Sequence, residues 1–459
     1  MTTATLRLPD TDAQAVPRPE RAAPRVRPPR ASTAVAVVVG AFVAFFPGYL
    51  PHGPVLQGAT TALCVLAAIV VARLLRRVRP PRSDRAGHFS RTAPGHGRRS
   101  DRAGRFSPRA HRLVLAACGV ALAETLVWTE VTQNAMRAAV GWGPAGPAYW
   151  AVLLATVAAL VALFRGVGAL WRRRGALRPA TGRRARGVWR PVVAVGVAAA
   201  VLVPAAAVHG APASPPAGPH SEQVLLRPSP AGAVRVYAGL RDGEDVTARA
   251  RRAADELARA GGLGKSRVVL VVPTGSGWVD ENAVRGLEHR FHGDVATVGL
   301  QYAHVPSWVG YLFDRDGAEQ AARALFRSVE RRVAQLPADR RPDLHVYGES
   351  LGATAGQAIF TGTPSAAQAR RDVCSVLWVG PPGGDTVGLP REAVVANADD
   401  PVVHAGPQLL WSPPDGDRPW LPGISFLQAG VDFIGSLAMP DGSGHRYGPD
   451  QVRQLQTCG

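Results

Sequence analysis

The chain has 459 residues and a formal net charge of +19, and the excess of basic residues lies in its first half. Residues 1–210 carry 29 arginines and 7 acidic residues, which gives +22, whereas residues 211–459 carry 24 basic and 27 acidic residues, which gives −3. The arginines form blocks between long uncharged stretches, which argues against a nucleic-acid-binding protein with a continuous basic surface. This alternation is typical of a membrane protein, here followed by a second domain of balanced charge.

Five apolar stretches of about bilayer length are expected to form transmembrane helices. They run from Ala31 to Leu50, Val55 to Leu75, Leu113 to Trp128, Tyr149 to Phe164 and Pro191 to Val208. The shorter stretches are still sufficient, because tilt and arginines at their ends absorb modest mismatch. The long arginine-rich approach to the first stretch, with no clear cleavage site of small residues, predicts an anchor and not a removable signal peptide.

The loops between these stretches alternate between arginine-rich and nearly uncharged. The arginine blocks lie in residues 1–30 and in the second and fourth connections. The first and third connections together hold one arginine, Arg137, and no lysine. Because positively charged loops stay on the cytoplasmic side, residues 1–30 are predicted to be a disordered cytoplasmic arm, and residues 31–210 a multi-span region with basic cytoplasmic loops. Five spans then place residues 211–459 outside the cell membrane, with the proline- and alanine-rich segment 211–232 as a stalk.

Residues 233–459 are predicted to form one α/β domain. The strands expected here are "AVRVYAGL", "SRVVLVVPTGSGW", "DVATVGLQY", "DLHVYGES", "SVLWVGPP", "AVVANADDP" and "GISFLQAG", and segments with helical patterns lie between them. Strands with continuous apolar runs that alternate with helices predict a buried, mostly parallel sheet.

One segment of this domain has the pattern of a nucleophile elbow. In "LHVYGESLGATAG", which runs from Leu344 to Gly356, Ser350 lies between Gly348 and Gly352 at the junction of a strand and a helix of small residues. In an α/β-hydrolase the serine occupies a strained turn at this junction, where larger neighbours would collide. Ser350 is therefore the predicted nucleophile of an α/β-hydrolase fold.

Backbone N–H groups near this serine are expected to stabilise an oxyanion. One donor follows the nucleophile directly, at Leu351. The second is expected in the open turn "VVPTGSGW", from Thr274 or Gly275.

A nucleophilic serine also needs a base and an acid, which in this fold follow in the order Ser, Asp or Glu, His. His445 in "DGSGHRYG" is the predicted base, and Asp400 in "NADDPVV" is the predicted acid. The alternatives for the acid are Asp399, Asp385 and Asp432. Asp400 is preferred because it follows the strand that usually carries the acid and because the proline after it favours an extended conformation.

These motifs together resemble bacterial membrane-anchored α/β-hydrolases of the kind common in actinobacteria, a family of largely uncharacterised function. The resemblance rests on "RVYAGL", "VVPTGSGWVDENAV", "GDVATVGLQY", "VPSWVGYL", "GESLGATAG", "LWVGPPGG", "DDPVV" and "GHRY", and covers about residues 233–447. The stretch "NADDPVVHA" lacks the aromatic residues of the family, and "DGSGHRY" has serine where another histidine is expected, so the rim of the pocket is expected to differ.

The sequence thus predicts an extracytoplasmic, membrane-anchored serine hydrolase, an esterase or lipase that acts through an acyl-enzyme. An envelope acyltransferase with the same triad is the alternative among enzymes, and a non-catalytic transport or scaffold protein with a ligand-binding hydrolase-like domain is the alternative outside them. The expected partners are the bilayer and an ester or lipid substrate, and no cofactor or metal is expected. An oxidising compartment makes a disulfide between Cys374 and Cys458 possible.

Overall fold

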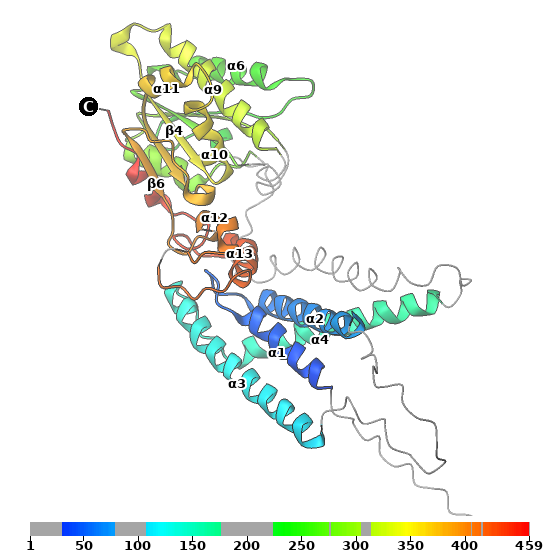
Figure 1. Ribbon diagram of the computed structural model, residues 1–459. Coiled ribbons are helices and arrows are strands. Elements are labelled where there is room, and N and C mark those ends of the chain that lie inside the picture. The colour runs from blue at the N-terminus through cyan, green and yellow to red at the C-terminus, as the bar shows by residue number, and fades with distance from the viewer. Residues whose placement is uncertain are drawn as a thin grey trace, which may run out of the picture.

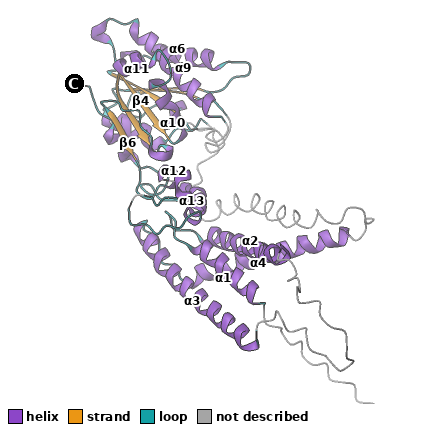
Figure 2. Cartoon of the chain, in the orientation of Figure 1, coloured by secondary structure: helices purple, strands orange, loops and turns teal. Residues whose placement is uncertain are grey.

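The computed structural model describes residues 30–78, 107–175, 224–274, 277–303, 314–404, 406–414 and 416–458. Long helices form the N-terminal part, and the strands are confined to the C-terminal part (Figures 1 and 2). The two parts meet where α12 (Pro401–His404) and α13 (Ile424–Gly435) lie above the first helices (Figure 1). The predicted cytoplasmic arm lies almost entirely outside the described residues.

The N-terminal part contains helices of very different lengths. They are α1 (Ala31–Phe45), α2 (Pro54–Val78), α3 (Pro108–Ala139) and α4 (Pro147–Gly175). The segments Pro54–Arg76, Pro108–Ala139 and Pro147–Leu170 are long and apolar enough to cross a membrane. Three of the five predicted spans therefore have a matching helix. The fifth, Pro191–Val208, lies outside the described residues.

The first predicted span is shorter in the structure than expected. Its helix α1 has 15 residues, or roughly 22 Å at 1.5 Å per residue, and Phe46 has extended backbone angles of φ −61° and ψ 132°. Pro47 explains the early end, because a residue that precedes proline is disfavoured in the helical region and proline itself has no N–H to donate. Residues 46–53, "FPGYLPHG", consequently form a loop between α1 and α2, which we call the α1–α2 loop.

The C-terminal domain is built on a parallel sheet, as predicted, and this sheet has six strands among the described residues. Its strands are β1 (Val234–Ala238), β2 (Arg267–Val272), β3 (Ala296–Leu300), β4 (Asp343–Glu349), β5 (Val373–Val379) and β6 (Glu392–Val395). Their order is β1-β3-β2-β4-β5-β6, and every neighbouring pair is parallel. The carboxyl ends of β4, β5 and β6 therefore lie at one edge of the sheet, where the loops after them can meet.

Helices cover both faces of this sheet. The larger core joins one face to α6 (Val246–Arg259), α9 (Arg315–Ala334), α10 (Leu351–Gln357) and α11 (Ala366–Asp372). The smaller core joins the other face to α7 (Glu281–Arg290) and to the short helix η8 (Pro449–Gln454). Alternate residues of β2 belong to the two cores, as expected for a strand buried on both faces.

The folded domain begins before the predicted boundary at residue 233. Val224 and Leu225, assigned above to the stalk, form the short helix η1 (Val224–Leu226) and are 3% and 2% exposed in the smaller core. Arg235 Nη1 donates to the Val224 carbonyl at 3.2 Å, which ties η1 to β1. The burial of two apolar side chains extends the domain to residue 224.

One predicted strand is wrong. The segment "GISFLQAG" belongs to α13, a 12-residue helix that starts after Gly423 at φ +72°. The buried side chains of this helix are Gln428, Ala429 and Asp432, a spacing that places them on one side of a helix. A short apolar run does not distinguish a buried strand from a helix, and here the tertiary contacts of these three residues favour the helix.

Cys374, in β5, and Cys458 form a disulfide, which confirms the possible pairing. The Cα atoms of the two residues are 5.7 Å apart and the residues are separated by 84 positions. The bond fixes the C-terminal segment beside β5. Cys64 in α2 and Cys118 in α3 are free.

Candidate active site

Ser350 lies in the turn between β4 and α10, as the elbow motif predicts. Its backbone has φ +55° and ψ −125°, and it is one of two residues other than glycine with positive φ in the described part of the chain. A Cβ atom added to Gly348 would approach the Gly352 carbonyl oxygen to 2.5 Å, and one added to Gly352 would approach the Val272 carbonyl oxygen to 2.2 Å. The two glycines are required because backbone lies directly against them.

Asp400 and His445 lie in contact. His445 Nδ1 is 2.8 Å from Asp400 Oδ2, and the Asp400 side chain is fully buried. Because a carboxylate can only accept, Nδ1 carries the hydrogen of the neutral ring and Nε2 keeps a free lone pair. Nε2 is buried and has no hydrogen-bond partner among the described residues, so it is free to accept a proton.

Two further donors fix the Asp400 carboxylate. Val402 N donates to Oδ1 at 2.8 Å, and the Tyr447 hydroxyl donates to Oδ2, the same oxygen that His445 contacts. Burial, together with the Asp400 charge, raises the pKa of Tyr447 far above its ordinary value, which keeps the phenol protonated as a donor. The sequence reasoning missed Tyr447, because His445 lies in the turn between Ser443 and Arg446 and Tyr447 follows that turn, so no strand-like alternation relates the two side chains.

The other candidate acids have different partners. Asp399 Oδ1 accepts a hydrogen bond from Gly444 N at 3.0 Å and so steadies the histidine loop. Asp385 is exposed. Asp432, in α13, is fully buried against the α1–α2 loop, where its carboxylate contacts His52. Of the four candidates only Asp400 contacts His445.

The serine turn and the histidine ring meet at the end of β5. Ser350 N donates to the Val379 carbonyl at 2.9 Å, and a Cβ atom added to the next residue, Gly380, would lie 2.7 Å from His445 Cε1. The residue that accepts from Ser350 N and the residue that lies against the imidazole are therefore consecutive in the chain. Gly380, at φ +53°, leaves the space that the ring occupies.

The two backbone segments predicted to donate to an oxyanion, at Leu351 and at the turn that begins with Thr274, differ in whether their N–H groups are free. Leu351 N, the first amide of α10, has no hydrogen-bond acceptor among the described residues and is free to bind an oxyanion. The turn at Thr274 is closed instead of open: Thr274 N donates to the Trp278 carbonyl at 3.0 Å, and Gly277 N donates back to Thr274 O at 2.8 Å. Gly277, at φ +84°, reverses the chain and so allows this pairing. Gly275, the other predicted donor, lies outside the described residues.

A buried polar network lies behind the serine. Tyr347, at the end of β4, is linked to Glu349 Oε2 at 3.1 Å and to Gln451 Oε1 at 2.8 Å, and Gln451 Nε2 donates to Asp280 Oδ2 at 2.7 Å. Burial and the nearby charge of Asp280 raise the pKa of Glu349 well above its ordinary value. A protonated Glu349 fits the geometry, because the single phenol hydrogen of Tyr347 cannot serve two acceptors. The residue before the nucleophile is thus a buried acid whose surroundings favour its protonated form.

The stability of the domain is expected to fall as pH rises from about 4 to about 6. Burial raises the pKa of Asp280 to about 6, so the folded protein holds this proton more tightly than the unfolded chain. The tighter binding of this proton adds to the free energy of unfolding. This addition is fully present below about pH 4 and is lost as pH rises through 6, a difference of about 3 kcal/mol. Asp280→Asn should flatten this slope while keeping an acceptor for Asn282 N, at the start of α7. Thermal unfolding of the full chain, followed by tryptophan fluorescence between pH 4 and 7, measures it. Exposed Asp339→Asn is the control, and an unchanged slope in Asp280→Asn would contradict the assignment.

One group of side chains has metal-ligand composition but does not fit a metal. Asp343, His345 and Cys374 lie within ligand distance of one another. However, the Cys374 sulfur is in the disulfide, and His345 Nδ1 contacts the Ser375 hydroxyl at 2.9 Å. The group also lies toward the start of β4, at the end opposite Ser350.

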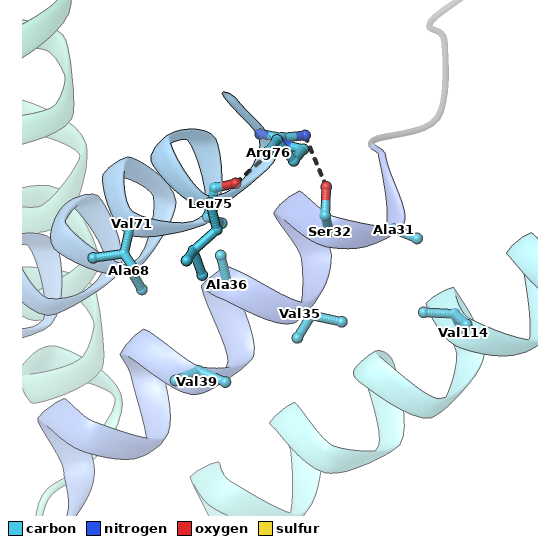
Figure 3. A pocket seen from close by; sticks show the side chains of 11 residues that line it. Ala31, Ser32, Val35, Ala36, Val39, Ala68, Val71, Leu75, Arg76 and Val114 are labelled. Carbon is cyan, nitrogen blue, oxygen red and sulfur yellow. Dashed lines mark hydrogen bonds between the residues drawn. The ribbon is translucent and has the colours of Figure 1, made fainter. Parts of the chain in front are cut away.

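An apolar groove lies away from these residues, among the N-terminal helices. It encloses about 550 Å³ between α1, α2 and α3, and its lining residues include Val35, Val71 and Leu75 (Figure 3). Arg76 closes one end by donating to Ser32 Oγ at 2.8 Å and to the Ala72 carbonyl at 3.0 Å (Figure 3). The residues that line this groove belong to α1, α2 and α3, and among the described residues none comes from the domain that holds Ser350.

The parallel sheet, the serine turn at positive φ and the contact between Asp400 and His445 at the same sheet edge are the arrangement of an α/β-hydrolase domain. Residues 234–389 match the sequence profile of an alpha/beta-hydrolase family. The matched segment contains Ser350 but ends before Asp400 and His445. No curated protein matches the chain.

Proposed function

We propose that this protein is a membrane-anchored, extracytoplasmic serine hydrolase that cleaves carboxylic esters, as an esterase or lipase, with Ser350, His445 and Asp400 as its triad. The observation that carries the proposal is the buried Asp400–His445 pair, whose free Nε2 lies at the sheet edge where the Ser350 turn is held. The match to an alpha/beta-hydrolase family supports hydrolase activity in general.

In the proposed reaction Ser350 Oγ attacks the ester carbonyl while His445 Nε2 takes the hydroxyl proton. The carbonyl oxygen becomes an oxyanion, which Leu351 N–H and a donor from the segment after β2 stabilise. When the intermediate collapses, His445 returns the proton to the leaving alcohol and an acyl-enzyme remains. Water then gives its proton to His445 and attacks the acyl group, which releases the acid and restores Ser350.

The Asp400 environment supports this role for His445. The three donors around the carboxylate, Val402 N, Tyr447 and His445, hold it in one orientation. A fixed carboxylate keeps the imidazole in the tautomer that the first step needs and stabilises the imidazolium that forms. No cofactor or metal ion enters this chemistry.

A fluorophosphonate probe tests the proposal directly on membranes that contain the full chain. Such a probe reacts with an activated serine and leaves an ordinary serine unmodified. We expect covalent labelling of Ser350 and hydrolysis of a soluble short-chain ester. A non-catalytic scaffold would give neither result. Transfer of the acyl group to an added alcohol in place of water, detected by mass spectrometry, would identify an acyltransferase.

Several observations support the placement of this domain outside a membrane. Three helices are long and apolar enough to cross a bilayer, and the arginine blocks at the predicted cytoplasmic loops favour an inside N-terminus. The Cys374–Cys458 disulfide is of the kind that persists in an oxidising compartment.

The topology is tested by adding a protease to intact spheroplasts. Cleavage between residues 211 and 223 is expected from the outside, because the part of the predicted stalk before the folded domain then faces the medium. Immunoblotting of the two fragments measures the cut, and a cytoplasmic marker protein controls for leakage. Cleavage confined to inverted vesicles would reverse the orientation.

A further inference from the structure

Helix α13 has one buried polar side and one exposed apolar side. Gln428 and Asp432 are fully buried, whereas Phe426, Leu427 and Phe433 are 42%, 45% and 39% exposed. This is the reverse of the usual surface helix, in which apolar residues face the core. The exposed apolar residues therefore call for a partner of their own.

The buried polar side of α13 is bonded to the end of α1 and to the α1–α2 loop. Gln428 Nε2 donates to the Val43 carbonyl in the last turn of α1. Asp432 accepts from Tyr49 N at 2.6 Å and contacts His52 Nε2 at 2.7 Å. These bonds fix the position of α13 at the level where α1 ends.

The Asp432 contact depends on close packing. A Cβ atom added to Gly48 would lie 2.1 Å from Asp432 Oδ2. Burial disfavours a charge on His52, but the hydrogen bond and the charge of Asp432 outweigh it and raise the pKa of His52. Both side chains of the pair are buried, so the loss of one partner would leave the other without its hydrogen bond, which is costly.

Aromatic side chains gather at this same level of the N-terminal helices. The rings of Phe42 and Phe46 lie 6.1 and 5.8 Å from that of Trp128 in α3, and Tyr149 packs against Trp150 at the start of α4, with ring centroids 5.6 Å apart. Tryptophan and tyrosine concentrate at the boundary between a bilayer and water. The end of α1, the part of α3 around Trp128 and the start of α4 therefore carry the side chains of a membrane surface.

The apolar side of α13 continues onto a neighbouring short helix. Residues Pro407–Leu410 pack against α13, and their outer side exposes Leu410 at 40%, followed by Trp411 at 65%. We call Leu410, Trp411, Phe426, Leu427 and Phe433 the apolar ledge.

The ledge adjoins the loops that carry the acid and the base. Helix α12, which follows Asp400 directly and packs against α13, ends at His404, whose ring stacks on Tyr49 at 5.8 Å. On the other side, Leu50 lies against Gly444, the residue before His445. The loops that carry Asp400 and His445 are thus both held next to α13 and the α1–α2 loop.

We propose that the apolar ledge inserts into the outer leaflet of the membrane and that the proposed esterase takes its substrate from there, as an ester held in the bilayer. This inference rests on the proposed function for its substrate and on the predicted spans for its geometry. The bilayer is the occupant that the structure favours, because α13 is bonded to the end of a predicted span beside an aromatic belt. Shallow insertion of leucine, phenylalanine and tryptophan is the usual way in which a helix lies in this interface.

Fluorescence on the full chain in proteoliposomes tests the insertion. Leu427→Cys, in a background with Cys64→Ser and Cys118→Ser, is labelled with an environment-sensitive dye in vesicles of phosphatidylcholine and phosphatidylglycerol. We expect a blue-shifted spectrum that nitroxide lipids with a shallow label quench. The matched control is Ala338→Cys, an exposed residue before β4 at the opposite end of the sheet, where neither change is expected.

The other outcomes overturn the inference. An unshifted spectrum at position 427 would mean that water covers the ledge. A blue shift without nitroxide quenching would mean that protein covers it, either the predicted fifth span or a second copy of the chain. Neither result depends on catalysis.

An activity measurement tests the substrate class separately. The double variant Phe426→Ser and Leu427→Ser should lower turnover of a long-chain ester embedded in vesicles by about tenfold or more, since it removes two of the apolar side chains proposed to enter the membrane. Turnover of a soluble short-chain ester should stay within about twofold, because neither side chain touches the triad. If the variant turned over the embedded ester as fast as the wild type does, the proposal of a bilayer substrate would be wrong. If the wild type itself did not hydrolyse the soluble short-chain ester, the proposed function would be wrong instead.

Discussion

Replacement of Ser350 by alanine should abolish fluorophosphonate labelling and lower ester hydrolysis by about a thousandfold or more. The change removes the attacking oxygen and nothing else that holds the turn, because the Ser350 side chain makes no capping hydrogen bond to α10. The backbone bond from Ser350 N to Val379 O is kept by alanine. Membrane insertion and thermal unfolding should therefore match those of the wild type.

Ser365→Ala is the control for this experiment. Ser365 lies at the start of α11, partly exposed, and its hydroxyl contacts only Thr363 among the described residues. Labelling and turnover should be unchanged in this variant. If Ser350→Ala kept full turnover, the reaction would belong to another residue and the proposed site would be wrong.

The second large effect is expected for Asp400→Asn, which should lower turnover by several orders of magnitude. An asparagine that accepts from Val402 N through its oxygen places its amide hydrogens toward His445 Nδ1 and Tyr447, where donors would face donors. The imidazole would then turn or change tautomer, and Nε2 would no longer accept the serine proton. Initial rates on a soluble ester measure this effect, with thermal unfolding as the check of folding.

Variants of the other acids separate the alternatives. Asp385→Asn should be nearly silent, because this side chain is exposed. Asp399→Asn should cost less than Asp400→Asn, because the new side chain keeps an oxygen that can accept from Gly444 N. If Asp385→Asn lost most of its turnover and Asp400→Asn lost little, the triad acid would be Asp385, in the loop after β5. The proposal of a serine hydrolase would still stand.

Much of the C-terminal fold was predictable from local patterns. Apolar runs predicted the parallel strands, and the glycines around Ser350 predicted the elbow, because backbone contacts two residues away set the requirement for glycine. The order of serine, acid and histidine predicted which loops would meet at one edge of the sheet. The contact between Asp400 and His445 is in the structure, and their catalytic role stays a prediction.

The remaining features depend on contacts between distant residues. The network of Glu349, Gln451 and Asp280 joins three parts of the chain that no local pattern connects. Helix α13 was mistaken for a strand because the reason for its polar side, the α1–α2 loop, lies almost 400 residues earlier in the sequence. The closed turn at Thr274 depends on Gly277 and on the hydroxyl of Tyr237 in β1, which donates to the Gly277 carbonyl.

The attachment of α13 to the α1–α2 loop also determines how a severed domain would behave. Once the stalk is cut, the domain would still be held by Asp432, Gln428 and the packing of Leu50 against Leu409, Ala429 and Met439. Shedding would therefore need detergent as well as a protease. A fragment expressed from residue 224 onward would lack the α1–α2 loop. The apolar side chains that pack against Leu50 would then meet water, and so would Asp432 without its partner His52. Such a fragment should self-associate, so purification of the whole chain in a lipid nanodisc is the better starting point for crystallisation or cryo-electron microscopy.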